Sequence, residues 1–337
     1  MKKYLLSKDT NTYRANLHCH TNVSDGALSP EEVKKIYVEH GYSIVAYTDH
    51  RVHLKHDELT DENFLALSGV EYDVNEKEKQ HEYRKCCHIC MIALDKDNDS
   101  QPCYNKNLKF HHPENHDVVN PDGTLAEFEM TFENVSDILK KGRDDGFFVT
   151  YNHPTWSMED YSDYMKYHGM HAMEISNYSC VSIGFPEYNA RIYDDILRSD
   201  ERIFAIATDD NHNKHAVGST RWDSFGGYTM IQAEKLEYKT ITDALLAGNF
   251  YSVTGDGGAQ IKELWYEDGK VHVECTEAVR IDVITGRRKC YTVTKPLDTT
   301  VTEGDFEVVP EDIYFRISIT DKHGNHTDTN AYFIDTL

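Results

Sequence analysis

Histidine and carboxylate residues recur at short spacings along the chain, and these side chains are common ligands of divalent metal ions. His18 and His20 stand two residues apart, so on a strand both imidazoles would face the same side. Asp25 follows in Ser-Asp-Gly, where a turn would present its carboxylate. Taken alone, such a histidine pair is a weak signal, because most pairs of this kind lie on surfaces or support other ligands.

Later apolar runs end in residues of the same kinds. One run ends at His50, the next at Glu71, another at His153, and a fourth at Asp210 and His212. The carboxyl ends of strands in a parallel α/β barrel meet on one face, so we expect these side chains to lie together. Buried there without partners they would be costly, whereas divalent ions would satisfy them. The pattern predicts a metal site.

The elements that position these residues alternate between short apolar runs and amphipathic stretches. Ser29, Pro30 and Glu32 form a helix-start signal, and Gly41 is a stop signal. Expected strands cover 44–47, 64–70, 89–94, 147–151, 172–176 and 203–207, and expected helices cover 30–40, 132–145, 187–199 and 241–247. This alternation predicts a parallel α/β sheet or barrel.

Two regions interrupt this rhythm. Residues 95–130 are polar and turn-rich, which is typical of a lid, a binding loop or a mobile segment. After the glycine-rich 255–260, short strand patterns with turn signals replace the helices and favour a small β-sandwich. We therefore expect a barrel domain over 1–257 and a β-sandwich over 258–337.

Length and charge limit the function further. The 337 residues suggest about two domains. The formal charge of −23 disfavours binding of long nucleic acids or of membranes, and no apolar run is long enough for a membrane span. The eight cysteines lack the dense framework of small secreted domains, and no signal peptide is visible, so a cytoplasmic location is expected.

The segment 16–50, with His-x-His, a following Asp and a strand ending in Asp-His, resembles the first two motifs of the PHP (polymerase and histidinol phosphatase) superfamily. Gly69-Val70-Glu71, Asn152-His153-Pro154 and Asp210-x-His212 match its later motifs in order, so the resemblance covers roughly 16–257. The stretch 244–251 and the strand-rich tail further resemble the CehA/McbA-like branch of metal-dependent phosphoesterases.

The resemblance implies a distorted (β/α)₇ TIM-like barrel that holds two or three divalent ions of manganese, iron or zinc. It assigns one ion to His18, His20, Glu71 and Asp210, a second to Glu71, His88 and His153, and a third to Asp25, His50 and His212. His88 precedes its apolar run, so only the family order selects it over neighbours such as His81. Asp209 and Asp210 are alternative candidates for the same ligand position. Asp210 is preferred, because its spacing to His212 would keep the side chains of Asp210 and His212 on one face.

The implied activity is hydrolysis of a phosphate ester, a small phosphomonoester or phosphodiester, by a metal-bridging hydroxide, with no side-chain nucleophile. Cationic or polar residues near the motifs could hold this small phosphorylated substrate: Asn177, Arg191, Lys214, His215 and Arg221. The alternatives are an exonuclease or oligonucleotide hydrolase, and a non-catalytic metal-containing binding protein. Oligomeric state does not follow from the sequence.

Several side chains have both a functional and a structural interpretation. Trp156 and Tyr151 beside His153 could stack on a base or sugar, but core packing is the more common role. Three histidines lie in the insertion: His111, His112 and His116. They could form a lid over the ions, although a solvated loop is the favoured interpretation. The cysteines at 86, 87 and 90 lack the second pair of a zinc knuckle, so buried thiols are the simpler interpretation.

Overall fold

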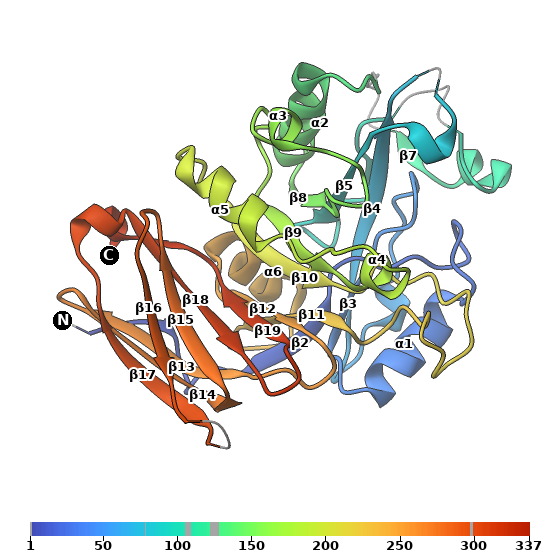
Figure 1. The fold of residues 1–337 in the computed structure, drawn as a ribbon. Coiled ribbons are helices and arrows are strands. Elements are labelled where there is room, and N and C mark those ends of the chain that lie inside the picture. The colour runs from blue at the N-terminus through green and yellow to red at the C-terminus, as the bar shows by residue number, and fades with distance from the viewer. Residues whose placement is uncertain (1, 78, 105–108, 122–127, 297–298) are drawn as a thin grey trace.

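The computed structural model describes residues 2–77, 79–104, 109–121, 128–296 and 299–337. Seven strands form a curled sheet with helices packed around it (Figure 1). In sheet order they are β10 (Phe204–Thr208), β9 (Ala172–Asn177), β8 (Phe147–Asn152), β5 (Cys86–Ala93), β4 (Leu65–Asn75), β3 (Ile44–Tyr47) and β2 (Thr12–Asn16). The His20 amide donates a hydrogen bond to the Asn211 carbonyl, and the Asp210 amide donates to the His18 carbonyl, both at 3.0 Å. These bonds join the segment after β2 to the segment after β10 and so close the sheet. The expected distorted seven-stranded barrel is confirmed.

A buried apolar cluster fills this part of the fold and takes side chains from every barrel strand. It includes Ala15, Ile44, Leu67, Ile92, Phe148, Ala172 and Ile206. These strands show no polar and apolar alternation, because both of their faces are buried. The core therefore holds the strand ends, and the side chains on them, in fixed positions.

The helices are α1 (Pro30–Glu39), α2 (Phe132–Asp144), α3 (Tyr161–Tyr164), α4 (Tyr178–Ser182), α5 (Ala190–Arg198) and α6 (Tyr238–Ala247). Two of them match their predicted ranges within one residue, α1 and α2, whereas α5 and α6 begin three residues away from their predicted starts and α3 and α4 were not predicted. At the start of α1, the Glu32 amide donates to Ser29 Oγ at 3.3 Å and the Ser29 amide donates to Glu32 Oε2 at 2.8 Å. Gly248 ends α6 with φ of 71°, a left-handed conformation that glycine adopts without strain.

The expectation of an all-parallel barrel is wrong at β5. This strand runs antiparallel to both β4 and β8, while β2, β3 and β4, and likewise β8, β9 and β10, pair in parallel. In the connection from β4 to β5, the described residues 76–77 and 79–85 contain a short turn, η2 (His81–Tyr83), and no crossover helix. A direct connection of this kind produces an antiparallel pair.

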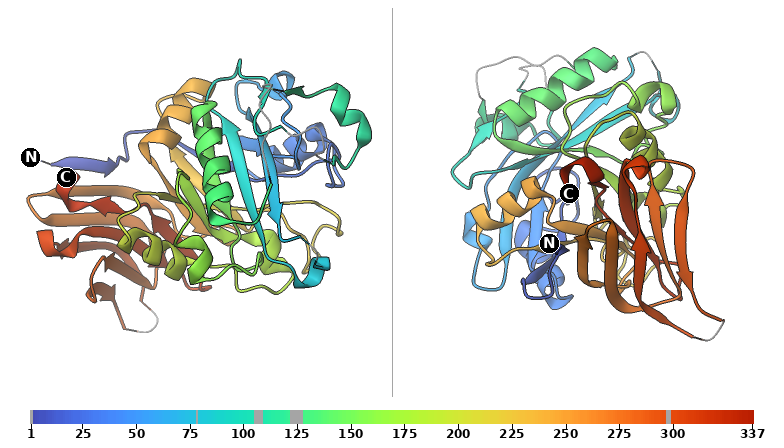
Figure 2. Two further views of the ribbon diagram at one scale, coloured as in Figure 1. Left: turned by 90° about the horizontal axis from the view of Figure 1, so that it is seen from above. Right: turned by 90° about the vertical axis from the view of Figure 1, so that its left-hand side faces the viewer.

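The C-terminal part is an antiparallel β domain, as expected. One sheet has the order β1-β13-β14-β17, and the other continues the barrel sheet through β11 and β12 to β19, β18, β15 and β16. The strands are β1 (Lys3–Leu6), β11 (Gly227–Gln232), β12 (Phe250–Thr254), β13 (Ile261–Glu267), β14 (Lys270–Ala278), β15 (Arg280–Thr285), β16 (Cys290–Thr294), β17 (Val301–Glu307), β18 (Tyr314–Thr320), β19 (His326–Thr329) and β20 (Tyr332–Phe333). Although β1 lies at the other end of the chain, it pairs with β13 alongside these strands (Figure 2). The boundary at residue 257 stays a prediction.

A buried ion network attaches this β domain to the barrel. Arg316 on β18 donates from Nε and Nη2 to the Asp194 carboxylate on α5, each at 2.9 Å. Its Nη1 donates to Asp328 on β19, also at 2.9 Å. Arg316 is only 1% exposed, so the network holds the two parts in one arrangement.

The polar insertion carries short elements that pack near the barrel mouth. β6 (Ser100–Gln101) pairs in parallel with β7 (Asn120–Pro121), and η3 (Pro113–Asp117) lies between them in the chain. Phe110 and Val119 pack against Val52, two residues after His50. Within the described ranges, no helix is long and apolar enough to cross a membrane.

Candidate metal centre

The nine residues predicted as ligands lie together where the barrel strands end. Three groups of side chains account for all of them, and in each group the possible ligand atoms lie within 4.8 Å of one another. The groups are His20, Asp25, His50 and His212; His18, His20 and Asp210; and Glu71, His88 and His153. The structure thus brings together segments that span most of the barrel sequence.

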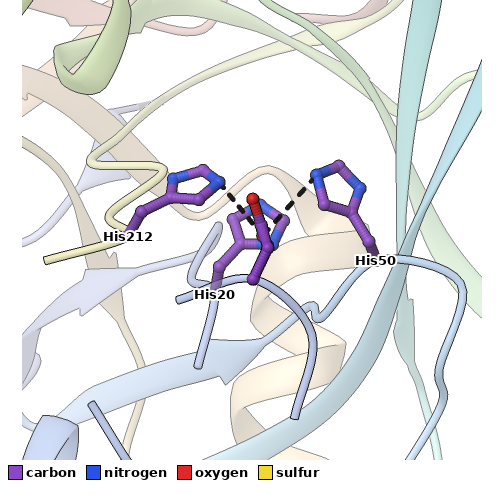
Figure 3. Close-up of side chains that lie close together, drawn as sticks. His20, His50 and His212 are labelled. Atoms are coloured by element: carbon purple, nitrogen blue, oxygen red, sulfur yellow. Dashed lines mark ion pairs between the residues drawn. The ribbon is translucent and has the colours of Figure 1, made fainter. Parts of the chain in front are cut away.

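The first group surrounds the Asp25 carboxylate. Its Oδ1 atom lies 3.3 Å from His212 Nε2, 3.8 Å from His20 Nδ1 and 4.0 Å from His50 Nε2. Figure 3 shows the three imidazoles turned toward a shared point. The His20 ring stacks at 4.3 Å, between centroids, on that of His212. Four ligand atoms from three segments, those after β2, β3 and β10, therefore converge.

Glu71, at 1% exposure, is the carboxylate of the third group and also lies against imidazoles of the other two groups. Its two oxygens lie within 3.4 Å of a ring nitrogen of five imidazoles, those of His18, His20, His50, His88 and His153. Asp210 completes this side, with Oδ1 at 3.2 Å from His18 Nε2 and 3.0 Å from His20 Nε2. One carboxylate thus connects the groups.

The direction of β5 explains the placement of His88, which precedes its apolar run. Since β5 is antiparallel to its neighbours, its first residues lie at the edge where β4 and β8 have their last residues. His88 pairs in register with Asn152, the residue before His153. In a barrel assumed to be parallel, the same residue would have been placed at the opposite end.

Two of the ligand candidates have left-handed backbone conformations. The φ angle is 27° at His153 and 52° at Asp210. Such angles are costly for residues other than glycine and persist where the surroundings hold them. The His153 amide donates to Glu174 Oε2 at 2.9 Å, and the Asp210 amide donates to the His18 carbonyl at 3.0 Å. The strain is therefore supported by hydrogen bonds at the site.

Glu174 is a positioning residue that the sequence analysis did not identify. This fully buried carboxylate on β9 lies 2.7 Å from His18 Nδ1 and accepts hydrogen bonds from Asn177 Nδ2 at 2.9 Å and Thr208 Oγ1 at 2.6 Å. Its contact with Nδ1 leaves Nε2 of His18 facing the ligand cluster. A charged residue in the middle of an apolar strand was the available signal.

The structure separates Asp209 from Asp210. The Asp209 carboxylate is buried away from the cluster and accepts hydrogen bonds from the Tyr37 hydroxyl and the amides of Phe225, Gly226 and Gly227. Asp49, also missed from the sequence, accepts from Thr21 and Ser24 and so orders the loop that carries Asp25. Asp210 is the member of the pair that reaches the imidazoles.

Burial and close charges shift the pKa values of these groups in opposite directions. Burial lowers the pKa of His50 to about 3. Burial acts the same way on His20, but the carboxylates of Asp210 and Glu71 outweigh it and raise the pKa to about 10. Burial works against ionisation of Glu71, yet the neighbouring imidazoles hold its pKa well below the usual range. The carboxylates thus require nearby positive charge, which protons or metal cations can supply.

Unpaired buried atoms indicate that a cation fits here. His20 Nδ1, Asp25 Oδ1 and Asp210 Oδ1 are buried and make no hydrogen bond of suitable geometry. Imidazole nitrogens and carboxylate oxygens that face one another across 3 to 4 Å are the donor types that manganese, iron and zinc accept. The clusters are consistent with a site for more than one metal ion.

A cavity of about 730 Å³ opens above the cluster and is lined by Asp25, His50, Glu71, His88, His153, Asp210 and His212. Two predicted substrate-binding residues lie at this site: Asn177 donates to Asp210 Oδ2 at 3.1 Å, and Lys214 Nζ lies 2.8 Å from Asp25 Oδ2. Like Arg191, His215 and Arg221, however, these two residues are not among the described residues that line the cavity. Arg191 instead binds Asp195 on its own helix, at 2.8 Å.

The structure also places the residues for which the sequence left two interpretations. The His111 ring stacks at 5.6 Å on that of His50 and lines the cavity, whereas the His116 ring packs on Phe110. Trp156 lines the cavity, while Tyr151 is fully buried and hydrogen-bonded to a carboxylate.

The predicted preference for buried thiols over a zinc knuckle agrees with the surroundings of the cysteines. Cys90 Sγ accepts a hydrogen bond from Asn152 Nδ2 at 2.9 Å, and burial raises the pKa of its thiol to about 11. Cys86, Cys87 and Cys90 are all buried and free of disulfide bonds. In the described part of the chain, the groups that could hold a metal contain no more than one cysteine.

Comparisons with known proteins give one family match and several similar solved structures. The PHP domain family matches residues 16–211. Among solved structures, the chain is similar to a two-domain protein from Bacteroides vulgatus that contains a predicted PHP-like metal-dependent phosphoesterase, with 13% identity, a TM-score of 0.48 and coverage of 98% of this chain and 96% of that one.

Two further similar structures cover about three fifths of this chain. A candidate metal-dependent phosphoesterase from Bifidobacterium adolescentis has 14% identity and a TM-score of 0.39, over 61% of this chain and 90% of that one. An amidohydrolase from Chromobacterium violaceum has 14% identity and a TM-score of 0.37, over 59% and 87%. No curated protein matches the chain.

Proposed function

This chain belongs to the PHP domain family, and from that premise we propose that it is a metal-dependent phosphoesterase that hydrolyses a small phosphate ester. The observation that carries the proposal is the convergence of nine imidazole and carboxylate side chains in three groups that share His20 or lie around Glu71. Such a set of donors suits several divalent ions held close together.

The residues that would hold the ions follow from the groups. His18, His20, Glu71 and Asp210 would hold one, Glu71 with His88 and His153 a second, and Asp25 with His50 and His212 a third. Bound manganese, iron or zinc would activate a water molecule near neutral pH and neutralise charge that develops on the phosphate. Cys90 also lies close to His18 and Glu71, but it is a less suitable metal ligand than the imidazoles and carboxylates, because burial raises the pKa of its thiol.

The chain's own residues would prepare the site for this chemistry. Glu174 and Asn177 hold His18 and Asp210 in place, so the ligands need no rearrangement. Lys214, an exposed residue, neutralises part of the Asp25 charge through an ion pair of 2.8 Å. With a formal charge of −23 overall, the protein offers an anion little attraction apart from this site, which supports a small substrate over a long nucleic acid.

We further propose that the protein belongs to the CehA/McbA-like branch. The segment that suggests this branch, 244–251, runs from the end of α6 through Gly248 into β12. Asn330 from the β domain donates to the backbone oxygens of Gly248 and Phe250, at 2.9 and 3.1 Å. The segment thus joins the barrel to the strand-rich tail.

The test is turnover by protein loaded with manganese, iron or zinc, on a panel of phosphomonoesters, small phosphodiesters and short RNA. We expect hydrolysis of at least one small ester and its loss in His20→Ala, because that side chain belongs to two ligand groups. Circular dichroism checks that the variant is folded. Turnover confined to RNA, or full activity in His20→Ala, would contradict the proposal.

A further inference from the structure

The cavity above the ligand cluster has an apolar wall that the proposed chemistry does not use. Trp156 and Met158 from the segment after β8 line it, together with Ile183 and Phe185 from the segment after α4. We call these four side chains the apolar lip. Met158, Ile183 and Phe185 are 41%, 43% and 37% exposed, and exposed apolar side chains gathered at a cavity commonly mark a ligand-binding surface.

The two segments of the apolar lip are fastened to each other. The buried Glu187 carboxylate accepts hydrogen bonds from the amides of Thr155 at 3.0 Å and Trp156 at 2.7 Å. The Phe185 amide donates to the Cys180 carbonyl at 3.0 Å, which folds the second segment back on α4. A buried carboxylate satisfied by two backbone amides keeps the lip formed before a ligand arrives.

Trp156 connects the apolar lip to the ligand cluster. Its ring lies edge-to-face on His153, with centroids 5.1 Å apart at 88°, and on His88, at 5.4 Å and 71°. The cavity wall also includes charged groups, among them the Arg51–Asp73 ion pair and Arg84. A molecule held at the ligand cluster would therefore face an apolar wall of the cavity, the apolar lip, and a charged part of the same wall.

We propose that the apolar lip binds the alcohol part of the substrate, so that the substrate class is the phosphate esters of apolar, aromatic alcohols. This inference rests on the proposed phosphoesterase function. A phosphate at the ligand cluster leaves the rest of the 730 Å³ cavity for the esterified group, and that space adjoins the lip. A flat aromatic ring buries apolar area against Trp156, Ile183 and Phe185, which a polyol cannot do without losing hydration.

The test compares 2-phenylethyl phosphate with glycerol 3-phosphate, because both release a primary alcohol of similar acidity. We expect the metal-loaded protein to favour the phenylethyl ester about tenfold or more in kcat/KM. In the double variant Ile183→Ser, Phe185→Ser the preference should fall to about twofold or less. Val181→Ser is the matched control, because Val181 is an exposed residue of α4, at 41%, that is absent from the cavity lining.

Binding to the manganese-loaded protein separates this inference from the proposed function. Calorimetry with 2-phenylethylphosphonate and methylphosphonate, which cannot be hydrolysed, should show the same preference and its loss in the double variant. Selective binding without turnover of either ester would contradict the phosphoesterase function and retain the lip. Equal binding of both phosphonates, or a preference that survives in the double variant, would overturn the inference.

Discussion

Glu159 provides the sharpest prediction about how pH acts on the segment that carries His153 and Trp156. Its carboxyl group is buried, and it accepts hydrogen bonds from the hydroxyls of Tyr151 and Tyr167, each at 2.7 Å. Burial, only partly offset by these bonds, raises the pKa of Glu159 to about 8 from an ordinary value of 4.5. The folded protein therefore holds a proton that the unfolded chain releases.

The sign of the pH effect follows from this difference. Below pH 4.5 the group is protonated in both states and costs nothing. As the pH rises from about 4.5 to 8, the unfolded chain binds fewer protons than the folded one, so the free energy of unfolding falls, at about 1.4 kcal/mol per pH unit. Between pH 5.5 and 7.5 this one group accounts for a loss of about 2.5 kcal/mol.

The substitution Glu159→Gln removes this dependence, because an amide is neutral in both states. We expect the difference in unfolding free energy between variant and wild type to shift in favour of the variant by about 2 to 3 kcal/mol from pH 5.5 to 7.5. Urea unfolding of the chelator-treated protein measures it, with the exposed Glu39→Gln on α1 as control. Parallel pH profiles for wild type and Glu159→Gln would refute the assignment of a raised pKa.

Three further substitutions test the site and its support. Asp25→Asn should remove about one equivalent of metal and lower kcat more than it raises KM. Metal analysis and steady-state kinetics on the proposed substrate panel measure these effects. Unchanged metal content would argue that Asp25 is not a ligand. Glu174→Gln should weaken metal affinity about 10- to 100-fold while the protein stays folded, because His18 loses a charged partner. Calorimetric titration measures the metal affinity, and an unchanged value would show that Glu174 has no positioning role. Arg316→Met leaves two buried aspartates without their cationic partner and should lower the free energy of unfolding by about 3 to 5 kcal/mol. A loss below about 1 kcal/mol in urea unfolding would contradict the network's importance.

The sequence was sufficient for features with a local or periodic cause. The capping box at Ser29 and Glu32 predicted the start of α1, and apolar runs located every barrel strand except β2, whose first residues are not buried. Ligand candidates at strand ends, such as Glu71 and His212, could be grouped because barrel geometry brings those ends together. Asp210 was preferred over Asp209 from spacing alone, and it is the one that reaches the cluster.

The rest depended on information that no local pattern contains. Nothing in the apolar run of β5 indicates that this strand runs antiparallel to its neighbours. A barrel assumed to be parallel would place His88 at the wrong end, so its position at the site could not be predicted from the run alone. The role of Glu174 could not be derived from its own strand, because three of its four partners, His18, His153 and Thr208, come from other segments. The apolar lip arises where two loops meet, and Glu187 joins them through backbone amides that carry no sequence signature.

The measurement that tests the central claim most directly is the metal content of the purified protein, determined by mass spectrometry after expression with manganese, iron and zinc supplied. If the nine side chains form a site for several ions, the protein should hold two to three equivalents of transition metal per chain, and His20→Ala should lose at least one. Less than one equivalent in the folded wild-type protein, or equal content in His20→Ala, would contradict the account.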